Sequence, residues 1–243
     1  MTYCIGLRLN KGLVFMSDTR TNAGVDNVSQ FKKMHTWLVP GERVITTLTA
    51  GNLATTQAVV SVLDERTKAP SDRSPSIFEA PSMFQVARLV GETLREEIQS
   101  NAKTGQKADS AFNSTIIVGG QIKGSEPRLF LIYPEGNFIE ASAETPFFQV
   151  GETKYGRPIL VRVYDPDMSF EDAVKLMMVS FDSTIKANLS VGLPLDLQVY
   201  ENDSFAVAQE KRIEADDPYF SLISAGWGDA LKQAFLSLPN FSF

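Results

Sequence analysis

Residues 2–20 of this 243-residue chain read TYCIGLRLNKGLVFMSDTR. Two apolar runs flank Asn10-Lys11-Gly12, a three-residue loop whose final glycine suits a left-handed backbone conformation. The pattern predicts a β-hairpin in which Cys4 lies opposite Asp18. Because side chains alternate along a strand, we expect Thr2, Cys4 and Asp18 on one face. The hairpin therefore sets the start of a sheet and the position of Thr2 at its edge.

Thr2 acquires a free α-amine if Met1 is removed, and its small side chain should permit that removal. One residue then carries a hydroxyl nucleophile together with a base that can accept its proton. Taken alone, a threonine at this position is more often an ordinary strand-initial residue with Met1 retained. The residues around Thr2 decide between the two interpretations.

A lysine is expected between Thr2 and Asp18. As diagonal neighbours on the hairpin, these two residues would lie about 7–8 Å apart, which leaves room for a third side chain. A lysine there would be held charged by Asp18 and would lower the pKa of the Thr2 hydroxyl or amine. The next predicted strand, residues 31–38, carries Lys32 and Lys33. Alternation along the strand allows only one of these lysines to be buried.

These residues resemble the proteasome β-subunit and HslV family of N-terminal-nucleophile hydrolases. The matching segments are Thr2, residues 17–20 (SDTR), residues 29–33 (SQFKK) and residues 49–51 (TAG). The resemblance is closest to the bacterial branch called Anbu, through residues 1–4 (MTYC) and 188–194 (NLSVGLP). It implies an α+β fold, a four-layer α-β-β-α sandwich of two antiparallel sheets. We expect residues 1–243 to form a single domain of this kind, without Met1.

The resemblance also implies roles for individual residues. Thr2 would be the nucleophile, and Asp18 and Lys33 would complete the catalytic centre. Gly51 would donate a backbone amide to the oxyanion hole. Ser190 matches a family serine, although it also fits an ordinary residue of a Gly/Pro/Ser turn.

Two positions depart from the family pattern. Glu152 stands where the family has a serine in a Gly-Ser-Gly stretch. Ala187, followed by Asn188, stands where the family has the aspartate of an Asp-x-x-Ser pair. A chain that lacks part of this supporting shell is expected to be a slow or very selective peptidase.

Hydrophobic periodicity and turn residues predict the remaining elements. Helices are expected over residues 53–66, 83–98 and 170–185, with Ser169 as a cap, and over part of the aromatic tail 218–238. Strands are expected over residues 43–49, 111–118, 128–133, 137–141, 147–151, 195–200 and 204–209. This order of elements is typical of antiparallel sheets covered by helices.

Composition excludes several classes of protein. The chain is 43% hydrophobic, which suffices for a sizeable core, and its net charge of −6 argues against nucleic-acid binding. No apolar run reaches the ~20 residues of a membrane span. The single cysteine, Cys4, excludes an internal disulfide and fits the reducing cytoplasm. His35 is the only histidine, so we expect no zinc site of the usual kind. The chemistry that the resemblance implies requires no metal and no organic cofactor.

The function most strongly indicated is a proteasome-type threonine peptidase acting on peptides or unfolded proteins. We expect a large homo-oligomer, a ring or an open helical stack, in which the aromatic tail packs on its own core or on a neighbour. An ATPase or adaptor partner would fit such a compartment. Two alternatives stay open: a proteasome-like assembly or binding shell without peptidase activity, and an N-terminal-nucleophile amidase that acts on a small amide.

Overall fold

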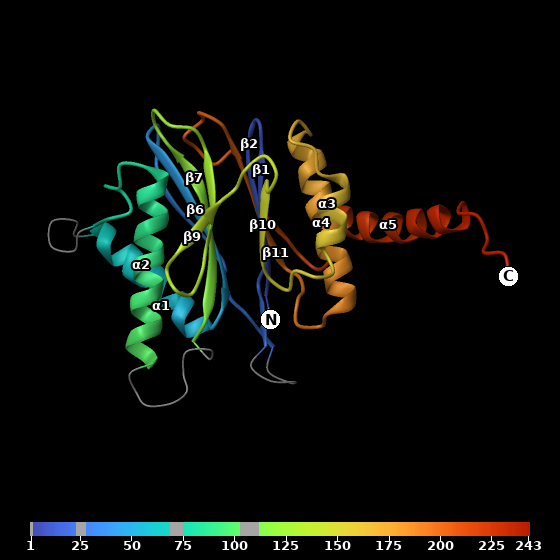
Figure 1. The fold of residues 1–243 in the computed structure, drawn as a ribbon, viewed down its shortest axis with the longest axis horizontal. Coiled ribbons are helices and arrows are strands. Elements are labelled where there is room, and N and C mark those ends of the chain that lie inside the picture. Colours follow the sequence, from blue (N-terminus) through green and yellow to red (C-terminus); the bar gives the residue numbers. More distant parts are fainter. Residues whose placement is uncertain (1, 23–27, 69–74, 103–111) are drawn as a thin grey trace.

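The computed structural model describes residues 2–22, 28–68, 75–102 and 112–243, and in these residues two antiparallel sheets face each other between helices. Helices α1 and α2 cover the outer face of one sheet, and α3 and α4 cover the other (Figure 1). The α+β four-layer sandwich predicted from the sequence is confirmed.

The first sheet is five-stranded and carries the N-terminal hairpin in its interior. Its strand order is β10 (Phe147–Gly151), β1 (Tyr3–Leu9), β2 (Gly12–Asp18), β11 (Leu195–Glu201) and β12 (Gln209–Ile213). Every side chain of β2 is buried, because the strand has helices on one face and the other sheet on the second. This burial on both faces explains why β2 reads as an almost continuous apolar run.

The second sheet is also five-stranded. Its strand order is β5 (Met34–Val39), β6 (Arg43–Gly51), β7 (Ser114–Ile122), β8 (Arg128–Ile132) and β9 (Phe138–Glu140). Two short strands, β3 (Arg20–Asn22) and β4 (Val28–Gln30), pair separately and lead from the first sheet to the second.

The helices are α1 (Leu53–Lys68), α2 (Met83–Ala102), α3 (Arg157–Val163), α4 (Phe170–Ala187) and α5 (Pro218–Leu236). The predicted cap of α4 is confirmed, because the Ser169 hydroxyl accepts the N–H of Asp172 at 3.0 Å. The sequence pattern did not predict α3. Its first turn contains Pro158, which is tolerated there because the first N–H groups of a helix have no partner within the helix.

Three apolar clusters hold the layers together. One lies between the first sheet and α3 and α4, a second lies between the second sheet and α1 and α2, and a third joins the two sheets. The sheets approach closely at Gly6, where an added Cβ would lie 2.9 Å from Ile117 Cγ2. A side chain at Gly6 would therefore push the two sheets apart.

The predicted register of the N-terminal hairpin is wrong by one residue. Leu9 pairs with Gly12, so the turn has two residues, and Cys4 lies opposite Ser17 and not Asp18. Gly12 serves strand packing, because a Cβ there would overlap with the carbonyl oxygen of Tyr200 on the adjacent strand β11. Gly12 suggested a left-handed loop residue in the sequence, but it is required by the close approach of β11, which comes about 190 residues later.

Three strand limits also differ from the prediction. The strand expected to begin at residue 31 begins at Met34. Strand β7 runs from Ser114 to Ile122, beyond the predicted end at residue 118, whereas residue 111 lies outside the described residues. Residues 204–208 are not part of β12, because Asp203 and Phe205 adopt positive φ angles of 61° and 45° that turn the chain.

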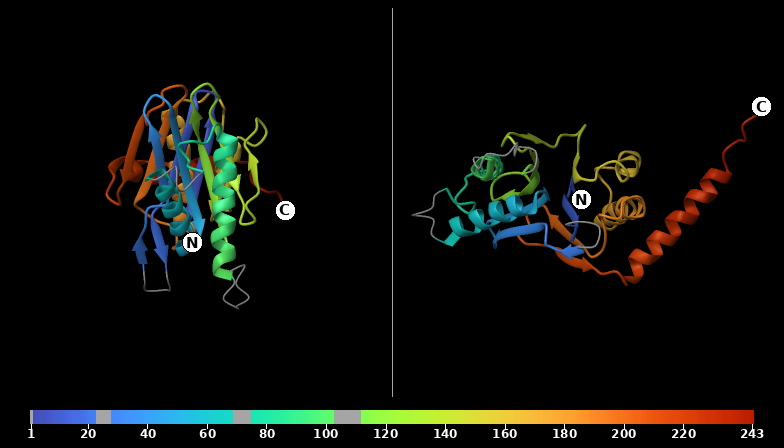
Figure 2. Two further views of the ribbon diagram at one scale, coloured as in Figure 1. Left: turned by 90° about the vertical axis from the view of Figure 1, so that its left-hand side faces the viewer. Right: turned by 90° about the horizontal axis from the view of Figure 1, so that it is seen from below.

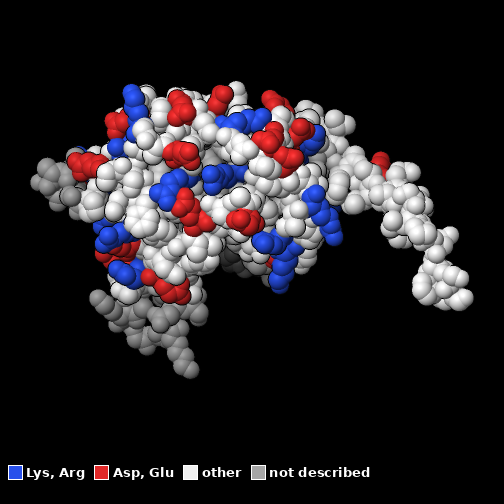
Figure 3. Space-filling view, turned by 45° about the horizontal axis from the view of Figure 1, so that its top comes forward, with Lys and Arg blue, Asp and Glu red and all other residues white. Residues whose placement is uncertain are grey.

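Helix α5 extends away from the sandwich (Figures 1 and 2). Its first turn packs on α4 through Phe220, which is buried. The later turns and the tail expose large apolar side chains, namely Leu231, Phe235, Leu236, Leu238, Phe241 and Phe243. Figure 3 shows charges of both signs mixed over one face of the sandwich. The α5 arm, which comprises α5 and the residues after it, carries few charges in this view. No helix in the described part of the chain is long and apolar enough to span a membrane.

Candidate active site

Thr2 lies at the start of the first sheet and is fastened there by the end of strand β10. Its carbonyl oxygen accepts the N–H of Glu152 at 2.7 Å. Gly151 has a φ of 84°, and a Cβ on it would overlap with the Thr2 carbonyl oxygen. The position of Thr2 thus depends on Gly151, about 150 residues later in the chain. The sequence pattern did not predict this contact.

Asp18 and Lys33 form a buried ion pair. Lys33 Nζ donates to Asp18 Oδ1 at 2.7 Å and to the carbonyl oxygen of Arg20 at 2.6 Å. The Asp18 side chain is 0% exposed and that of Lys33 is 4% exposed. Two opposite charges enclosed in this way interact strongly, because little water screens them.

Asp18 is held at the end of β2 by the neighbouring strand. Its Oδ1 also accepts the backbone N–H of Tyr3 at 3.0 Å, whereas its Oδ2 has no hydrogen-bond partner among the described residues. Burial raises the pKa of Asp18, and the charge of Lys33 and the N–H groups of Tyr3 and Gly192 oppose that rise. The observed register places Asp18 on the opposite strand face from Thr2 and Cys4, which corrects the predicted shared face. Asp18 still reaches Lys33, because it is the last residue of its strand.

Lys32 and Lys33 have different surroundings. The Lys32 side chain is 52% exposed and its Nζ lies 3.8 Å from a carboxylate oxygen of Glu210. Both lysines precede strand β5 and do not belong to it. The expectation that only one of the two is buried agrees with the structure, although the cause is the path of the connecting segment and not strand alternation.

A cavity of about 320 Å³ joins three of the residues proposed from the sequence. Thr2, Lys33 and Gly51 line it. Its other walls are neutral and come from Thr21, Thr49, Ala50, Leu53, Thr56 and Gly151. Gly51 has a φ of 117°, and a Cβ there would come within 2.7 Å of Ser114 Cα. The cavity can therefore bring a small carbonyl compound to the Thr2 hydroxyl, the Lys33 ammonium and the Gly51 backbone.

Ser190 does not line this cavity. It is half-buried in the loop after α4, and its backbone N–H donates to Asn188 Oδ1 at 2.9 Å. The loop itself belongs to the surroundings of the centre, because the N–H of Gly192 favours the charged form of Asp18. The catalytic role expected of Ser190 stays a prediction.

One departure from the family pattern, Glu152, contacts the residue that follows the other departure, Ala187. Asn188 Nδ2 donates to Glu152 Oε2 at 3.0 Å, across 36 positions of sequence. Glu152 is also the residue whose N–H binds the Thr2 carbonyl oxygen. Inspected along the sequence, residues 152 and 188 show no sign of this contact.

Cys4 is unsuited to act as a nucleophile. Its side chain is fully buried between the sheets, and Sγ lies 3.7 Å from the Thr49 carbonyl oxygen. Burial raises the pKa of the thiol, so the reactive thiolate is scarce. Among the residues that the structure describes, no group of three or more His, Cys, Asp and Glu side chains could hold a metal ion.

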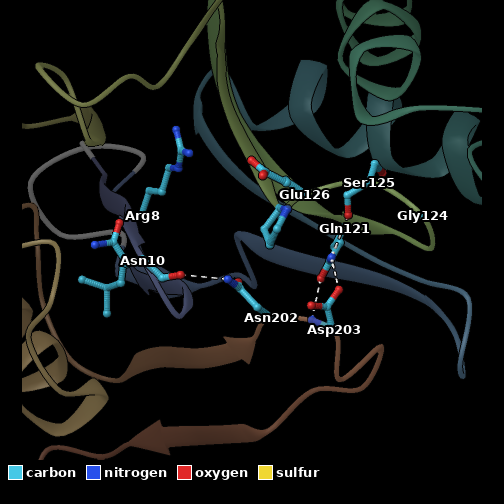
Figure 4. A pocket seen from close by; sticks show the side chains of 10 residues that line it. Arg8, Asn10, Gln121, Gly124, Ser125, Glu126, Asn202 and Asp203 are labelled. Carbon is cyan, nitrogen blue, oxygen red and sulfur yellow. Dashed lines mark hydrogen bonds between the residues drawn. The ribbon is translucent and has the colours of Figure 1, made fainter.

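A larger cavity, of about 670 Å³, lies at the opposite end of the sandwich, where β1 ends (Figure 4). Gln121 binds the two sides of this region together. Its Nε2 donates to Ser125 O and Asp203 Oδ1, each at 2.7 Å, and its Oε1 accepts the Asp203 N–H and the Tyr200 hydroxyl. The cavity contains none of the residues proposed from the sequence.

Comparisons with known proteins agree with this fold. A family model described as proteasome subunit matches residues 2–193. Among solved structures, an Anbu Gly-1 mutant from Hyphomicrobium sp. strain MC1 is 53% identical, with a TM-score of 0.92 and 100% of both chains covered. Anbu (ancestral beta-subunit) from Yersinia bercovieri is 47% identical, with a TM-score of 0.93, covering 99% of this chain and 100% of that one.

A third solved structure is titled as the helical assembly of the Anbu complex from Pseudomonas aeruginosa. It is 44% identical, with a TM-score of 0.91 and coverage of 99% and 98%. Among curated proteins, the proteasome subunit beta of Methanocaldococcus jannaschii is 23% identical over 213 residues, covering 88% of this chain and 87% of that protein.

Proposed function

Because the chain belongs to the proteasome subunit family, we propose that it is a threonine peptidase that cleaves peptide bonds with Thr2 as its N-terminal nucleophile. The observation that carries this proposal is the buried Lys33–Asp18 ion pair, whose lysine lines the same cavity as Thr2. A buried charge of this kind is costly unless it has a task or a strong partner, and such groups concentrate at active sites.

The proposed reaction needs Met1 removed. The Thr2 hydroxyl attacks the peptide carbonyl carbon, and the α-amine of Thr2 accepts the hydroxyl proton, directly or through a water molecule. Lys33, held by Asp18, stabilises the deprotonated oxygen. The Gly51 amide stabilises the negative oxygen of the tetrahedral intermediate, a contribution of about 3–4 kcal/mol in comparable sites. The C–N bond of the peptide then breaks, the leaving amine takes the proton from the Thr2 α-amine, and an ester to Thr2 forms. Water hydrolyses that ester, which releases the carboxylic acid product and restores the Thr2 hydroxyl. No step requires a metal or organic cofactor.

A covalent probe tests this function without knowledge of the substrate. We expect a peptide β-lactone to add its mass to the N-terminal peptide of the processed wild-type protein, at the Thr2 hydroxyl. The Thr2→Ala variant should take up no label, and Lys32→Ala, which changes an exposed lysine outside the cavity, should be labelled like the wild type. Label on another residue, or equal label in Thr2→Ala, would contradict the proposal.

We propose further that the protein works as a homo-oligomer, a ring or an open helical stack. The exposed apolar side chains of the α5 arm support this, because an apolar surface of that size is normally covered. A second copy of the chain is the occupant we propose, since a similar Anbu protein is described as a helical assembly. Such an assembly would restrict access to Thr2.

Truncation of the arm tests the assembly. Removal of residues 229–243 keeps Phe220 and Ile223, which pack on the core, and deletes the exposed Leu231, Phe235 and Leu236. We expect light scattering to show the full chain as an oligomer at micromolar concentration and the truncated chain as a much smaller species. A full chain that stays monomeric would overturn the proposed assembly.

A second candidate function is an assembly or binding shell without peptidase activity. Glu152 in place of the family serine and Ala187 in place of the family aspartate favour it. In that case the oligomer would form, Met1 could remain, and the β-lactone would leave Thr2 unmodified. The combination of mass spectrometry and light scattering therefore separates the two candidates.

A further inference from the structure

Glu152 is a buried acidic residue next to the start of the chain. The residue as a whole is only 9% exposed. Within the described ranges, no Lys, Arg or His nitrogen lies within 4.0 Å of its carboxylate. Buried carboxylates normally have a cationic partner or several hydrogen bonds.

The contacts of Glu152 hold its carboxylate in place with neutral donors. Asn188 Nδ2 donates to Oε2 at 3.0 Å, and the backbone N–H of Lys154 donates to Oε1 at 3.3 Å. Asn188 is itself oriented, because its Oδ1 accepts the Ser190 N–H at 2.9 Å. The backbone N–H of Glu152 binds the Thr2 carbonyl oxygen at 2.7 Å. The carboxylate therefore belongs to the same residue that holds the Thr2 backbone in place.

We propose that Glu152 is the counter-ion of the α-ammonium group that Thr2 acquires when Met1 is removed, and that Asn188 orients Glu152 for this role. Both act as positioning residues. The inference rests on the N-terminal processing in the proposed function, and it does not require that the protein hydrolyses peptides.

The charges around Thr2 leave Glu152 as the acidic group without a cation. Lys33 approaches the same cavity from the segment before β5, but Asp18 at the end of β2 already neutralises it. Arg20 on β3 donates to the Leu189 carbonyl oxygen, and Lys154 after β10 is exposed. An ammonium on Thr2 would therefore have, on the adjoining segment, a carboxylate held by neutral donors, and across the cavity an ion pair that is already neutral overall.

This arrangement restrains the nucleophile. A nearby carboxylate stabilises an ammonium and raises the pKa of the amine. A protonated amine cannot accept the hydroxyl proton, so the proposed base acts only once the pH exceeds that raised pKa. Hydrolysis should then increase into the alkaline range, and neutralising Glu152 should move this increase to lower pH.

The pH dependence of amine acetylation measures this effect directly. The protein is released from a fusion by a protease that leaves Thr2 first, and is treated with acetic anhydride at a series of pH values. Mass spectrometry of the N-terminal peptide reports acetylation of Thr2. We expect the midpoint to lie above the ~7.7–8.0 of an ordinary α-amine, and to fall by about one pH unit in Glu152→Gln.

Three further variants complete the test. Glu152→Asp keeps the charge and should keep a raised midpoint, whereas Glu144→Gln removes an exposed carboxylate and should leave the midpoint unchanged. Asn188→Ala should lower the midpoint partly. Equal midpoints in the wild type and Glu152→Gln, or a wild-type midpoint in the ordinary range, would overturn the inference. Acetylation needs no turnover, so an inactive protein would count against the proposed peptidase and not against this role of Glu152.

Discussion

Both ends of the β-sandwich carry a cavity lined by residues of both sheets, but the two cavities differ in chemistry. The larger one, about 670 Å³, lies where β1 ends, and Gln121 joins its two sides through hydrogen bonds to Tyr200, Ser125 and the exposed Asp203. The smaller one, about 320 Å³, lies where β1 begins and contains the ammonium of a buried ion pair. We propose the smaller cavity as the reactive one, because a buried charged pair lies at its wall.

The two ends should also respond differently to mutation. Removing a group at the Thr2 end should change chemistry, because its polar groups face a cavity. Removing a group at the Gln121 end should change stability, because its polar groups satisfy one another.

The largest effect is expected for Thr2→Ala. We expect the variant to lose all hydrolysis of peptide substrates, because the attacking oxygen is gone. Its free energy of unfolding should stay within about 0.5 kcal/mol of the wild type, as for surface changes. Turnover assays and urea unfolding measure the two quantities. Hydrolysis by Thr2→Ala at the wild-type rate would show that Thr2 is not the nucleophile. The two ends of the sandwich would then no longer differ in reactivity.

Lys33→Ala should affect both quantities. Activity should disappear, and stability should fall by about 3–5 kcal/mol, because Asp18 keeps a buried charge without its partner. Lys32→Ala provides the matched control on the neighbouring exposed lysine, with stability and activity near the wild type. Asp18→Asn, which removes the orphaned charge, should recover part of the stability in the Lys33→Ala background. Equal tolerance of Ala at both lysines would show that the buried pair has no role.

Gln121→Ala should affect stability alone. The change removes the Gln121 partner of the buried Tyr200 hydroxyl, which costs about 1–3 kcal/mol, whereas the exposed Asp203 can bond to water instead. Urea unfolding should show this loss, whereas the covalent labelling of Thr2 in the folded variant should proceed at the wild-type rate. Slower labelling with normal stability would mean that the far end communicates with Thr2.

The smallest effect concerns Cys4, which lies two residues from Thr2. We expect iodoacetamide at pH 8 to leave the thiol of the native protein unmodified, because burial raises its pKa and blocks access. The same treatment in urea should modify it fully, which serves as the control. Rapid alkylation of the native protein would show that the Thr2 end opens, and that its reactivity reflects exposure and not a specific centre.

Local pattern was sufficient for much of the architecture. The apolar runs in residues 2–20, the cap at Ser169 and the periodicity of residues 83–98 each report how one element meets the core, and the structure confirms these elements. The family resemblance pointed to Thr2, Lys33 and Gly51, which the fold brings to one cavity.

Local pattern was insufficient wherever two distant segments decide the outcome. The predicted hairpin register was wrong, and Gly12 lies within a strand because a Cβ there would overlap with the Tyr200 carbonyl oxygen of β11. Lys33 is buried because the segment before β5 carries it to Asp18, and not because of a strand alternation.

Local sequence was enough to predict most of the elements, with α3 an exception, and the residue types available for chemistry, because burial and turn formation depend mainly on near neighbours. The contact between Glu152 and Asn188 beside Thr2, and the departure of α5 from the sandwich with exposed apolar side chains, are visible only once the chain is folded. These outcomes depend on contacts between residues tens to hundreds of positions apart. Such contacts follow from how whole layers pack, so no short stretch of sequence contains them.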